Sequence, residues 1–184
     1  MSRKTLLSLI VLLGVVIVVL ISALTERETP SPTPLEGTPE DDIGPGVQSV
    51  TLVFGDWNAS RTVSETRELR VPEDRAGRLR RILEELADGP TERGAVRTIP
   101  QGTVVRRAFF DDTGDVYIDF SREFITKHPG GSTGELFTIR SIVQTVAENF
   151  PEVERVGVLV DGEHVETIAG HIDASVPFRV SDYR

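Results

Sequence analysis

The chain has 184 residues, with 29 acidic and 20 basic side chains, a formal charge of −9 and no cysteine. This length suits one globular domain with appendages. The missing cysteines exclude disulfide bonds, thiolate metal sites and a cysteine nucleophile. The acidic balance disfavours nucleic acid as a partner, because binding it requires a basic surface.

The first 24 residues have the composition of a membrane anchor. After Arg3 and Lys4, residues 5–24 carry no charge and are dominated by Leu, Val and Ile. Twenty such residues in a helix span about 30 Å, the thickness of the hydrocarbon layer, whereas the apolar part of a cleaved signal peptide usually has about 7–15 residues. With no cysteine to carry a lipid, we predict that residues 1–24 form a short cytoplasmic stub and an uncleaved single-pass transmembrane helix. The positive-inside rule places the N-terminus in the cytoplasm and the rest of the chain outside the cell membrane.

Residues 25–47 differ in composition from the segments on either side. Their prolines are Pro30, Pro32, Pro34, Pro39 and Pro45, set among Thr, Ser, Glu and Gly with no aromatic residue. Such a segment cannot bury enough apolar surface to fold, so we predict a disordered tether. The globular domain is expected over 48–184.

The first half of this domain shows two strands and a helix. Ser49–Phe54 and Thr66–Val71 have strand patterns on either side of a polar turn at 56–58. Residues 72–90 then place apolar side chains at helical spacing and end with Gly-Pro, a helix stop. The apolar positions are Leu79, Ile82, Leu83, Leu86 and Ala87.

The second half repeats this order. Thr103–Phe110 and Asp115–Ser121 flank a turn-forming Asp-Asp-Thr-Gly, which predicts a hairpin. A helix follows from about Thr133 to Asn149, then a hairpin through the Asp-Gly at 161–162, and Val176–Val180 is a candidate to close the sheet. The order β-β-α-β-β-α-β-β predicts an α+β domain in which two helices pack on one mixed sheet.

The glycine-rich segment 128–135 could be read as a phosphate loop. It lacks the lysine of that motif and carries a glutamate where an anion would lie. The spacing Ser132-x-x-Glu135 is instead typical of a capping box, in which the serine oxygen and the glutamate side chain each bond the other's backbone N–H. We therefore interpret this segment as the start of the second helix, and we expect no nucleotide partner.

Several short motifs resemble, in order and spacing, the GerMN domain of sporulation and spore germination proteins. They cover residues 49–180: LADGP (86–90), TIPQGT (98–103), VYIDFSREF (116–124), GSTGE (131–135), QTV (144–146), VLVDG (158–162) and IAGHIDASVPF (168–178). The resemblance implies an extracytoplasmic, envelope-associated domain without known catalytic residues. This chain has one copy, whereas the sporulation protein has two in tandem.

The histidines His128, His164 and His171 are candidates for a metal site. His171 and Asp173 could supply two ligands, with Asp161 nearby. Zinc needs three or four converging ligands, and no H-x-x-x-H pair occurs, so we expect no metal and interpret residues 170–171 as a turn.

Two further segments could carry function. Asp111, Asp112 and Asp115 could attract calcium, but the remaining ligands of a calcium loop are absent, and a hairpin turn with positive φ at Gly114 is favoured. The loop Ile99–Thr103 is favoured as a rigid turn, with a binding loop as the alternative.

Asp119 and Glu123 could form a glycosidase pair acting on peptidoglycan. That reaction needs two carboxylates across a cleft, and Asp119 alternates with apolar residues, so we expect it to point away from the core. No G-x-S-x-G or S-x-x-K motif occurs. We therefore predict no catalytic or cofactor-binding residues.

These observations favour a membrane-anchored, non-catalytic interaction module of the cell envelope. Its expected partner is an envelope protein or peptidoglycan, in sporulation, germination or envelope assembly. The alternative is a peptidoglycan hydrolase using Asp119, Glu123 or Glu135.

Overall fold

The computed structural model describes residues 46–183. The predicted anchor at 1–24 lies outside these residues, as does the predicted tether except for its last two positions. Among the described helices, none is long and apolar enough to cross a membrane.

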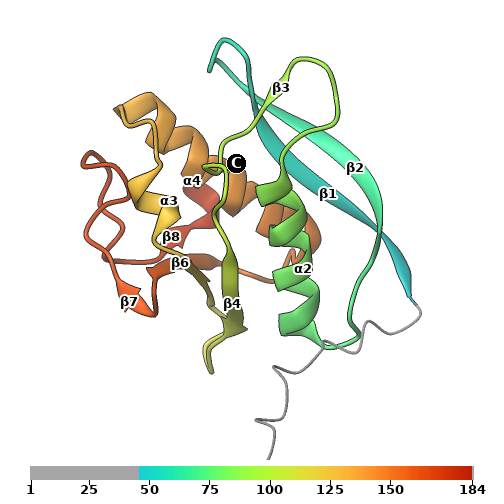
Figure 1. The fold of residues 1–184 in the computed structure, drawn as a ribbon. Helices are drawn as coiled ribbons and strands as arrows, with labels where there is room; N and C mark the ends of the chain where they lie inside the picture. Colours follow the sequence, from blue (N-terminus) through green and yellow to red (C-terminus); the bar gives the residue numbers. More distant parts are fainter. Residues whose placement is uncertain (1–45, 184) are drawn as a thin grey trace, which may run out of the picture. The chain divides into compact units, whose positions relative to one another are not determined.

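The helices and strands of residues 46–183 are labelled as in Figure 1. In order they are β1 (Val47–Asp56), β2 (Thr62–Arg70), α2 (Arg75–Asp88), β3 (Ala95–Val96), β4 (Val105–Phe110), β5 (Val116–Phe120), α3 (Glu123–Thr126), α4 (Ser132–Asn149), β6 (Arg155–Val160), β7 (Glu163–His164), β8 (Phe178–Arg179) and a final 3-10 turn η1 (Val180–Asp182). The predicted α+β class, both long helices and the hairpins at 111–114 and 161–162 are confirmed.

The strands form two sheets, so the prediction of one mixed sheet is wrong. One sheet has the order β2-β1-β3 and is antiparallel. The second has the order β4-β5-β6-β7, with β8 also paired to β6, and its central pair β5–β6 is parallel. The β1–β2 hairpin lies apart from β4, with α2 between them in the view of Figure 1.

A polar stripe on α4 explains why the hairpin does not join the second sheet. The β1 backbone at Thr51 and Val53 points away from β2, and side chains of α4 pair with it. The Thr51 N–H donates to Asn149 Oδ1 at 3.1 Å, and Asn149 Nδ2 donates to the Thr51 carbonyl at 2.7 Å. The Val53 N–H donates to Thr145 Oγ1, and Ser141 Oγ donates to the Val53 carbonyl. This polar ladder occupies the edge where another strand would pair.

The hydrophobic core lies among the two sheets and both long helices. Helix α2 begins at Asp74, whose side chain accepts from the Gly77 N–H, and its five predicted apolar residues are all buried. Helix α4 is buried nearly all round, and it buries the polar groups of Thr138, Ser141 and Thr145 as well. The polar ladder satisfies Ser141 and Thr145, and the Thr138 hydroxyl donates to the Thr98 carbonyl at 2.7 Å, so this central helix needs no purely apolar surface.

Candidate functional site

Buried acidic side chains are the first place to look for catalysis, because catalytic carboxylates need an altered environment. Five are buried in the described residues: Asp56, Glu65, Asp115, Asp119 and Glu135. Asp56 accepts from Ser60 and Arg61 within its own turn. Asp115 is paired with Arg155 at 2.8 Å. Glu65, Asp119 and Glu135 each accept from a backbone N–H of a segment distant in the sequence.

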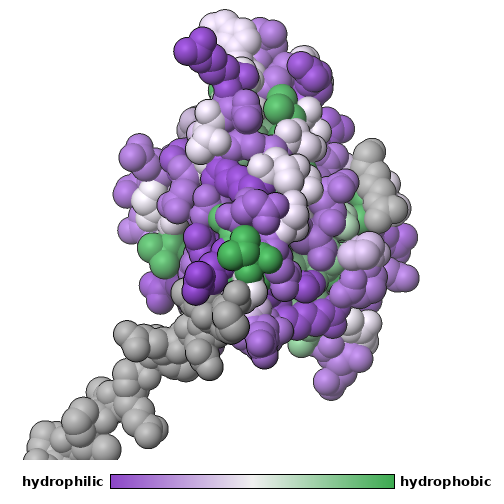
Figure 2. Space-filling model, turned by 90° about the vertical axis from the view of Figure 1, so that its right-hand side faces the viewer, coloured by the Kyte–Doolittle hydropathy of each residue, from purple (hydrophilic) through white to green (hydrophobic). Residues whose placement is uncertain are grey.

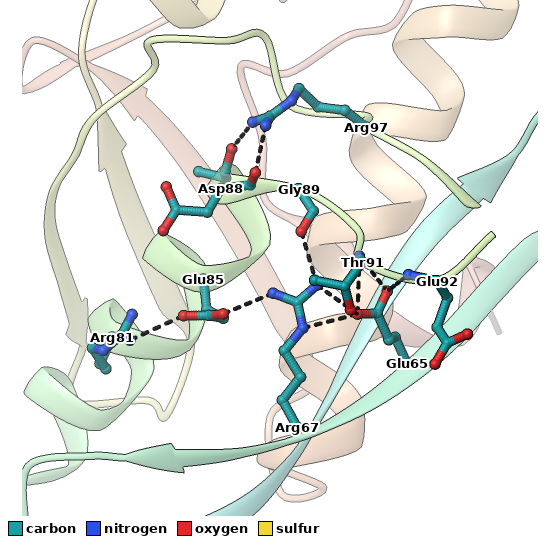
Figure 3. Close-up of polar contacts among 10 residues, drawn as sticks. Glu65, Arg67, Arg81, Glu85, Asp88, Gly89, Thr91, Glu92 and Arg97 are labelled. Carbon is teal, nitrogen blue, oxygen red and sulfur yellow. Dashed lines mark hydrogen bonds and ion pairs between the residues drawn. The ribbon is translucent and has the colours of Figure 1, made fainter. Parts of the chain in front are cut away.

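Glu65 lies at the centre of a polar cluster between β2 and the end of α2 (Figure 3). Its side chain is 3% exposed and pairs with Arg67, whose Nη2 lies 2.6 Å from Glu65 Oε1. It also accepts from the hydroxyl and backbone N–H of Thr91. Arg67 in turn donates to Glu85 at 2.7 Å and to the Gly89 carbonyl at 2.8 Å. The cluster therefore joins β2 to the end of α2 and to the loop that follows.

The same cluster keeps Glu65 ionised. Burial alone would raise the pKa of Glu65, but the hydrogen bonds from Thr91 and Arg67 outweigh burial, and the pKa lies below its ordinary value. A carboxylate in this state accepts hydrogen bonds but holds no proton to donate at neutral pH. The hydrogen bonds of this cluster therefore stabilise the fold.

Helix α2 ends within the LADGP motif (86–90), and Arg97, which follows β3, binds its last carbonyl groups. Its guanidinium donates to the carbonyls of Ala87 and Asp88, which the helix itself leaves unpaired. Gly89 has φ +92°, and a Cβ there would lie 2.7 Å from an Arg97 nitrogen. The glycine is therefore required both by the backbone turn and by the arginine above it.

Glu135 is fully buried near the start of α4 and binds a distant loop. Its carboxylate accepts from the backbone N–H groups of Ile168, Ala169 and His171 at 2.9–3.0 Å, and His171 Nδ1 lies 3.2 Å away. Burial would raise the pKa of Glu135, but these backbone donors outweigh burial and lower it. Glu135 fixes the loop at 168–171 against α4.

The capping box predicted at Ser132 and Glu135 is therefore wrong. The cap residue of α4 is Gly131, and no side chain bonds to the helix start. The Glu135 side chain turns away from Ser132 because the loop at 168–171 offers it several N–H donors at once. A pattern four residues long cannot reveal a partner more than 30 positions away.

Asp119 points away from the core, as predicted, but it is not exposed to solvent. It lies on the face of β5 opposite Ile118 and Phe120, yet it is only 1% exposed, because Arg107 and the β6–β7 turn cover it. The Gly162 N–H donates to it at 2.7 Å, and Arg107 Nη2 lies at 3.2 Å. Glu123 begins α3, where the Ser121 hydroxyl, as the largest cause, lowers its pKa. The lowered pKa of Glu123 is the opposite of the raised carboxyl pKa that a glycosidase acid requires.

The histidines and their acidic neighbours have separate partners. The Asp173 carboxylate accepts from the Ser175 N–H, and Asp161 pairs with Arg106 at 2.9 Å. His171 Nδ1 lies 3.2 Å from the Glu135 carboxylate. No group of three metal-ligating side chains occurs among residues 46–183. His164 lies against the Tyr117 ring edge.

His128 closes the turn at 128–130. Its Nδ1 accepts from the Gly130 N–H at 3.0 Å, and its Nε2 lies 3.0 Å from Thr138 Oγ1. Burial lowers the pKa of His128, which favours the neutral ring that can accept from Gly130.

Both remaining predicted segments are turns. The Asp111 carboxylate accepts from the N–H groups of Thr113 and Asp115, and Gly114 has φ +87°. In the second segment the Thr103 N–H donates to the Pro100 carbonyl at 3.1 Å and Gly102 has φ +85°. The turn interpretation is confirmed in both.

The outer face of the second sheet, which points away from the core, carries an aromatic row. We use this name for Phe109, Tyr117 and His164. Phe109 is 40% exposed and stacks on Tyr117 with ring centroids 5.6 Å apart. Tyr117 lies over Gly157 on the neighbouring strand, where a Cβ would be 2.5 Å from the ring. The glycine leaves room for the tyrosine on the sheet surface.

An arginine pair lies on the same face. Arg155 and Arg179 stand directly opposite each other on β6 and β8. They line a pocket of about 510 Å³ together with Pro151, Val153, Glu154, Val180 and Ser181.

The side of the domain drawn in Figure 2 has no comparable row of aromatic rings: it is largely hydrophilic, and its hydrophobic residues form small separate spots. The outer face of the second sheet is therefore our candidate functional site.

Sequence reasoning did not identify this face. The alternation of Phe109 and Tyr117 with core residues around the turn at 111–114 was a usable signal. The arginine pair gave none, because a two-residue strand at 178–179 and its pairing partner are not recognisable from local sequence.

Comparisons with known proteins agree with this fold. Residues 51–166 match the Germane family, described as sporulation and spore germination. A presumed lipoprotein from Clostridium perfringens is 25% identical with a TM-score of 0.53, over 74% of this chain and 90% of that chain. The tandem GerMN domains of the sporulation protein GerM from Bacillus subtilis are 21% identical with a TM-score of 0.61, over 74% of this chain and 48% of that chain. The first of these domains alone is 21% identical with a TM-score of 0.55, over 71% of this chain and 97% of that chain. No curated protein matches.

Proposed function

The chain belongs to the Germane family of sporulation and spore germination domains, and from this membership we propose that it is a non-catalytic interaction module of the cell envelope. It binds an envelope protein or peptidoglycan and serves sporulation, germination or envelope assembly. The resemblance of its motifs to the GerMN domain, noted above from sequence, is confirmed by the family match and by the shared fold.

One observation carries the non-catalytic part of this proposal. All five buried carboxylates of residues 46–183 accept hydrogen bonds from neighbouring groups, and those groups hold the fold together. A general acid needs a carboxyl that keeps its proton, whereas the pKa of Glu65, of Glu135 and of Glu123 is lowered. Aromatic and guanidinium groups, which suit recognition, lie instead on the outer face of the second sheet.

The proposal includes a single-pass anchor at residues 1–24. A protein of similar fold, from Clostridium perfringens, is described as a presumed lipoprotein. This sequence has no cysteine to acylate, and the uncharged stretch at 5–24 offers an alternative means of attachment. Protease added to intact protoplasts should therefore degrade the domain. Protection of the domain would reverse the topology.

The test of function is retention without turnover. The purified full-length protein is incubated with cell wall material and with solubilised envelope proteins. We expect it to retain one of them and to release no soluble muropeptides. Release that is abolished by Glu123→Gln, but not by the matched exposed control Glu148→Gln, would favour the hydrolase instead.

A further inference from the structure

We propose that the outer face of the second sheet binds a sugar unit that carries a carboxylate or a phosphate. This inference rests on the proposed function, since it names the ligand class of an envelope-binding module. Binding such a ligand requires a group that binds an anion, a surface that binds a sugar ring, and a short distance between these two parts of the site.

The arginine pair supplies the anion-binding group. Two like charges directly opposite each other on paired strands destabilise a sheet. The Asp115 carboxylate satisfies Arg155 through both Nε, at 3.1 Å, and Nη2. Arg179 forms no ion pair within residues 46–183 and lines the pocket, so its donors are available to a ligand. An anion bound in the pocket accepts from Arg179 and from the Arg155 donors that Asp115 leaves unused, and it offsets the repulsion between the two arginines.

The remaining pocket lining favours a sugar over a simple polyanion. Glu154 lies beside the arginine pair, and its carboxylate repels a second negative group. The same carboxylate accepts hydrogen bonds from sugar hydroxyls, and the exposed Ser181 hydroxyl, which donates to Asp182, can accept one as well. A ligand with one anionic group among several hydroxyls satisfies this set.

The aromatic row lies within one sugar length of the arginine pair. Gly157 is two residues beyond Arg155 on β6, on the same face, which corresponds to about 6.6 Å along a strand. The Tyr117 ring covers that glycine, and Phe109 extends the surface to the edge of the sheet. Aromatic ring faces are weakly negative, so they attract the C–H groups on the face of a sugar ring. The anion and the ring of one acidic sugar can thus contact both groups.

Sheet packing alone explains only part of this arrangement. An aromatic ring across from a glycine stabilises a sheet, and this accounts for Tyr117 and Gly157. It does not account for an exposed Phe109 or for a second arginine opposite Arg155.

The test uses full-length protein and three probes in a direct binding titration. These are a muropeptide bearing muramic acid, a purified wall polymer of phosphate-linked sugar units, and neutral chitobiose. We expect one acidic probe to bind and chitobiose to bind at least about tenfold more weakly. Which acidic probe binds identifies the source of the anion.

Variants locate the binding. Arg179→Glu should weaken the affinity for the acidic probe by about tenfold or more, and it should reduce the salt dependence of binding. Arg93→Glu makes the same charge change at an exposed site in the loop before β3 and should have no effect. Phe109→Ser should weaken binding while leaving its salt dependence unchanged.

Equal binding by wild type and Arg179→Glu, or equal binding of chitobiose and the acidic probes, would overturn the inference. Wall material that is still retained by Arg179→Glu would place the contact elsewhere and leave the proposed function standing. Failure to retain either wall material or envelope protein would instead refute the proposed function itself.

Discussion

Glu65 and Glu135 are both buried carboxylates with lowered pKa values, but different groups stabilise them. Glu65 is paired with a guanidinium two residues along its own strand, and Thr91 adds a hydroxyl and an N–H. Glu135 depends on backbone N–H groups of a loop 33–36 residues away. The first carboxylate stabilises a local junction, and the second holds a distant segment in place.

This difference shows what a buried charge can do for a fold. A side-chain pair can be replaced by a well-packed apolar pair at little cost. Backbone N–H groups cannot be replaced, so removing their acceptor leaves them buried without a partner. We therefore expect the domain to tolerate loss of the Arg67 cation better than loss of the Glu135 charge.

Glu135→Gln should have the largest effect. The amide keeps the size of the side chain but removes its charge and turns N–H donors toward other N–H donors. We expect a loss of about 3 kcal/mol in the free energy of unfolding, measured by urea denaturation. Hydrogen exchange at 168–171 should also accelerate. Glu148→Gln, an exposed change on the same helix, is the control, and an equal loss there would contradict a specific role for Glu135.

Arg67→Met should cost about 2 kcal/mol, because it leaves Glu65 buried without its cation. The loss is smaller than at Glu135 because Thr91 and Glu92 still donate to Glu65. Arg70→Met on the same strand is exposed and should change stability by less than about 0.5 kcal/mol. If Arg67→Met destabilised more than Glu135→Gln, the ranking of the two carboxylates would be reversed.

Acid should destabilise both regions. The folded-state pKa of each glutamate lies below about 4.5, its usual value. The unfolded chain therefore binds more protons at low pH, so this stability is present above about pH 4.5 and is lost as the pH falls through the folded pKa values. Unfolding free energies measured across this range should fall less steeply in Glu135→Gln. An unchanged slope would mean that Glu135 is not ionised in the folded protein.

Ser132→Ala should have the smallest effect, within about 0.5 kcal/mol of wild type. Its side chain makes no cap bond, although it lies three residues before Glu135. Thermal unfolding of the two proteins is sufficient to measure this. A loss of about 1 kcal/mol or more would restore the capping box.

Local patterns predicted the parts of the fold that local chemistry determines. The spacing of Leu79, Ile82 and Leu86 predicted α2, and the turn at 111–114 predicted a hairpin. The division into two sheets was not predictable, because it depends on Ser141, Thr145 and Asn149 meeting β1 about 90–100 positions earlier in the chain. Their polar side chains look ordinary in a helix until that partner is known.

The candidate site was missed for the same reason. Tyr117, Gly157 and Arg179 come from three strands that meet only through sheet pairing. Resemblance to the GerMN domain predicted the family, yet it carried no site residues to this chain.

The polar ladder between α4 and β1 also has a consequence for the order of events during synthesis. The N-terminal hairpin leaves the ribosome long before Asn149 does, so the free edge of β1 at Thr51 and Val53 is exposed meanwhile. An unpaired strand edge can pair with the same edge on another chain. We therefore expect the interval before α4 docks to be the period in which this protein is most prone to aggregate, and Asn149 is the last residue of the polar ladder to be synthesised.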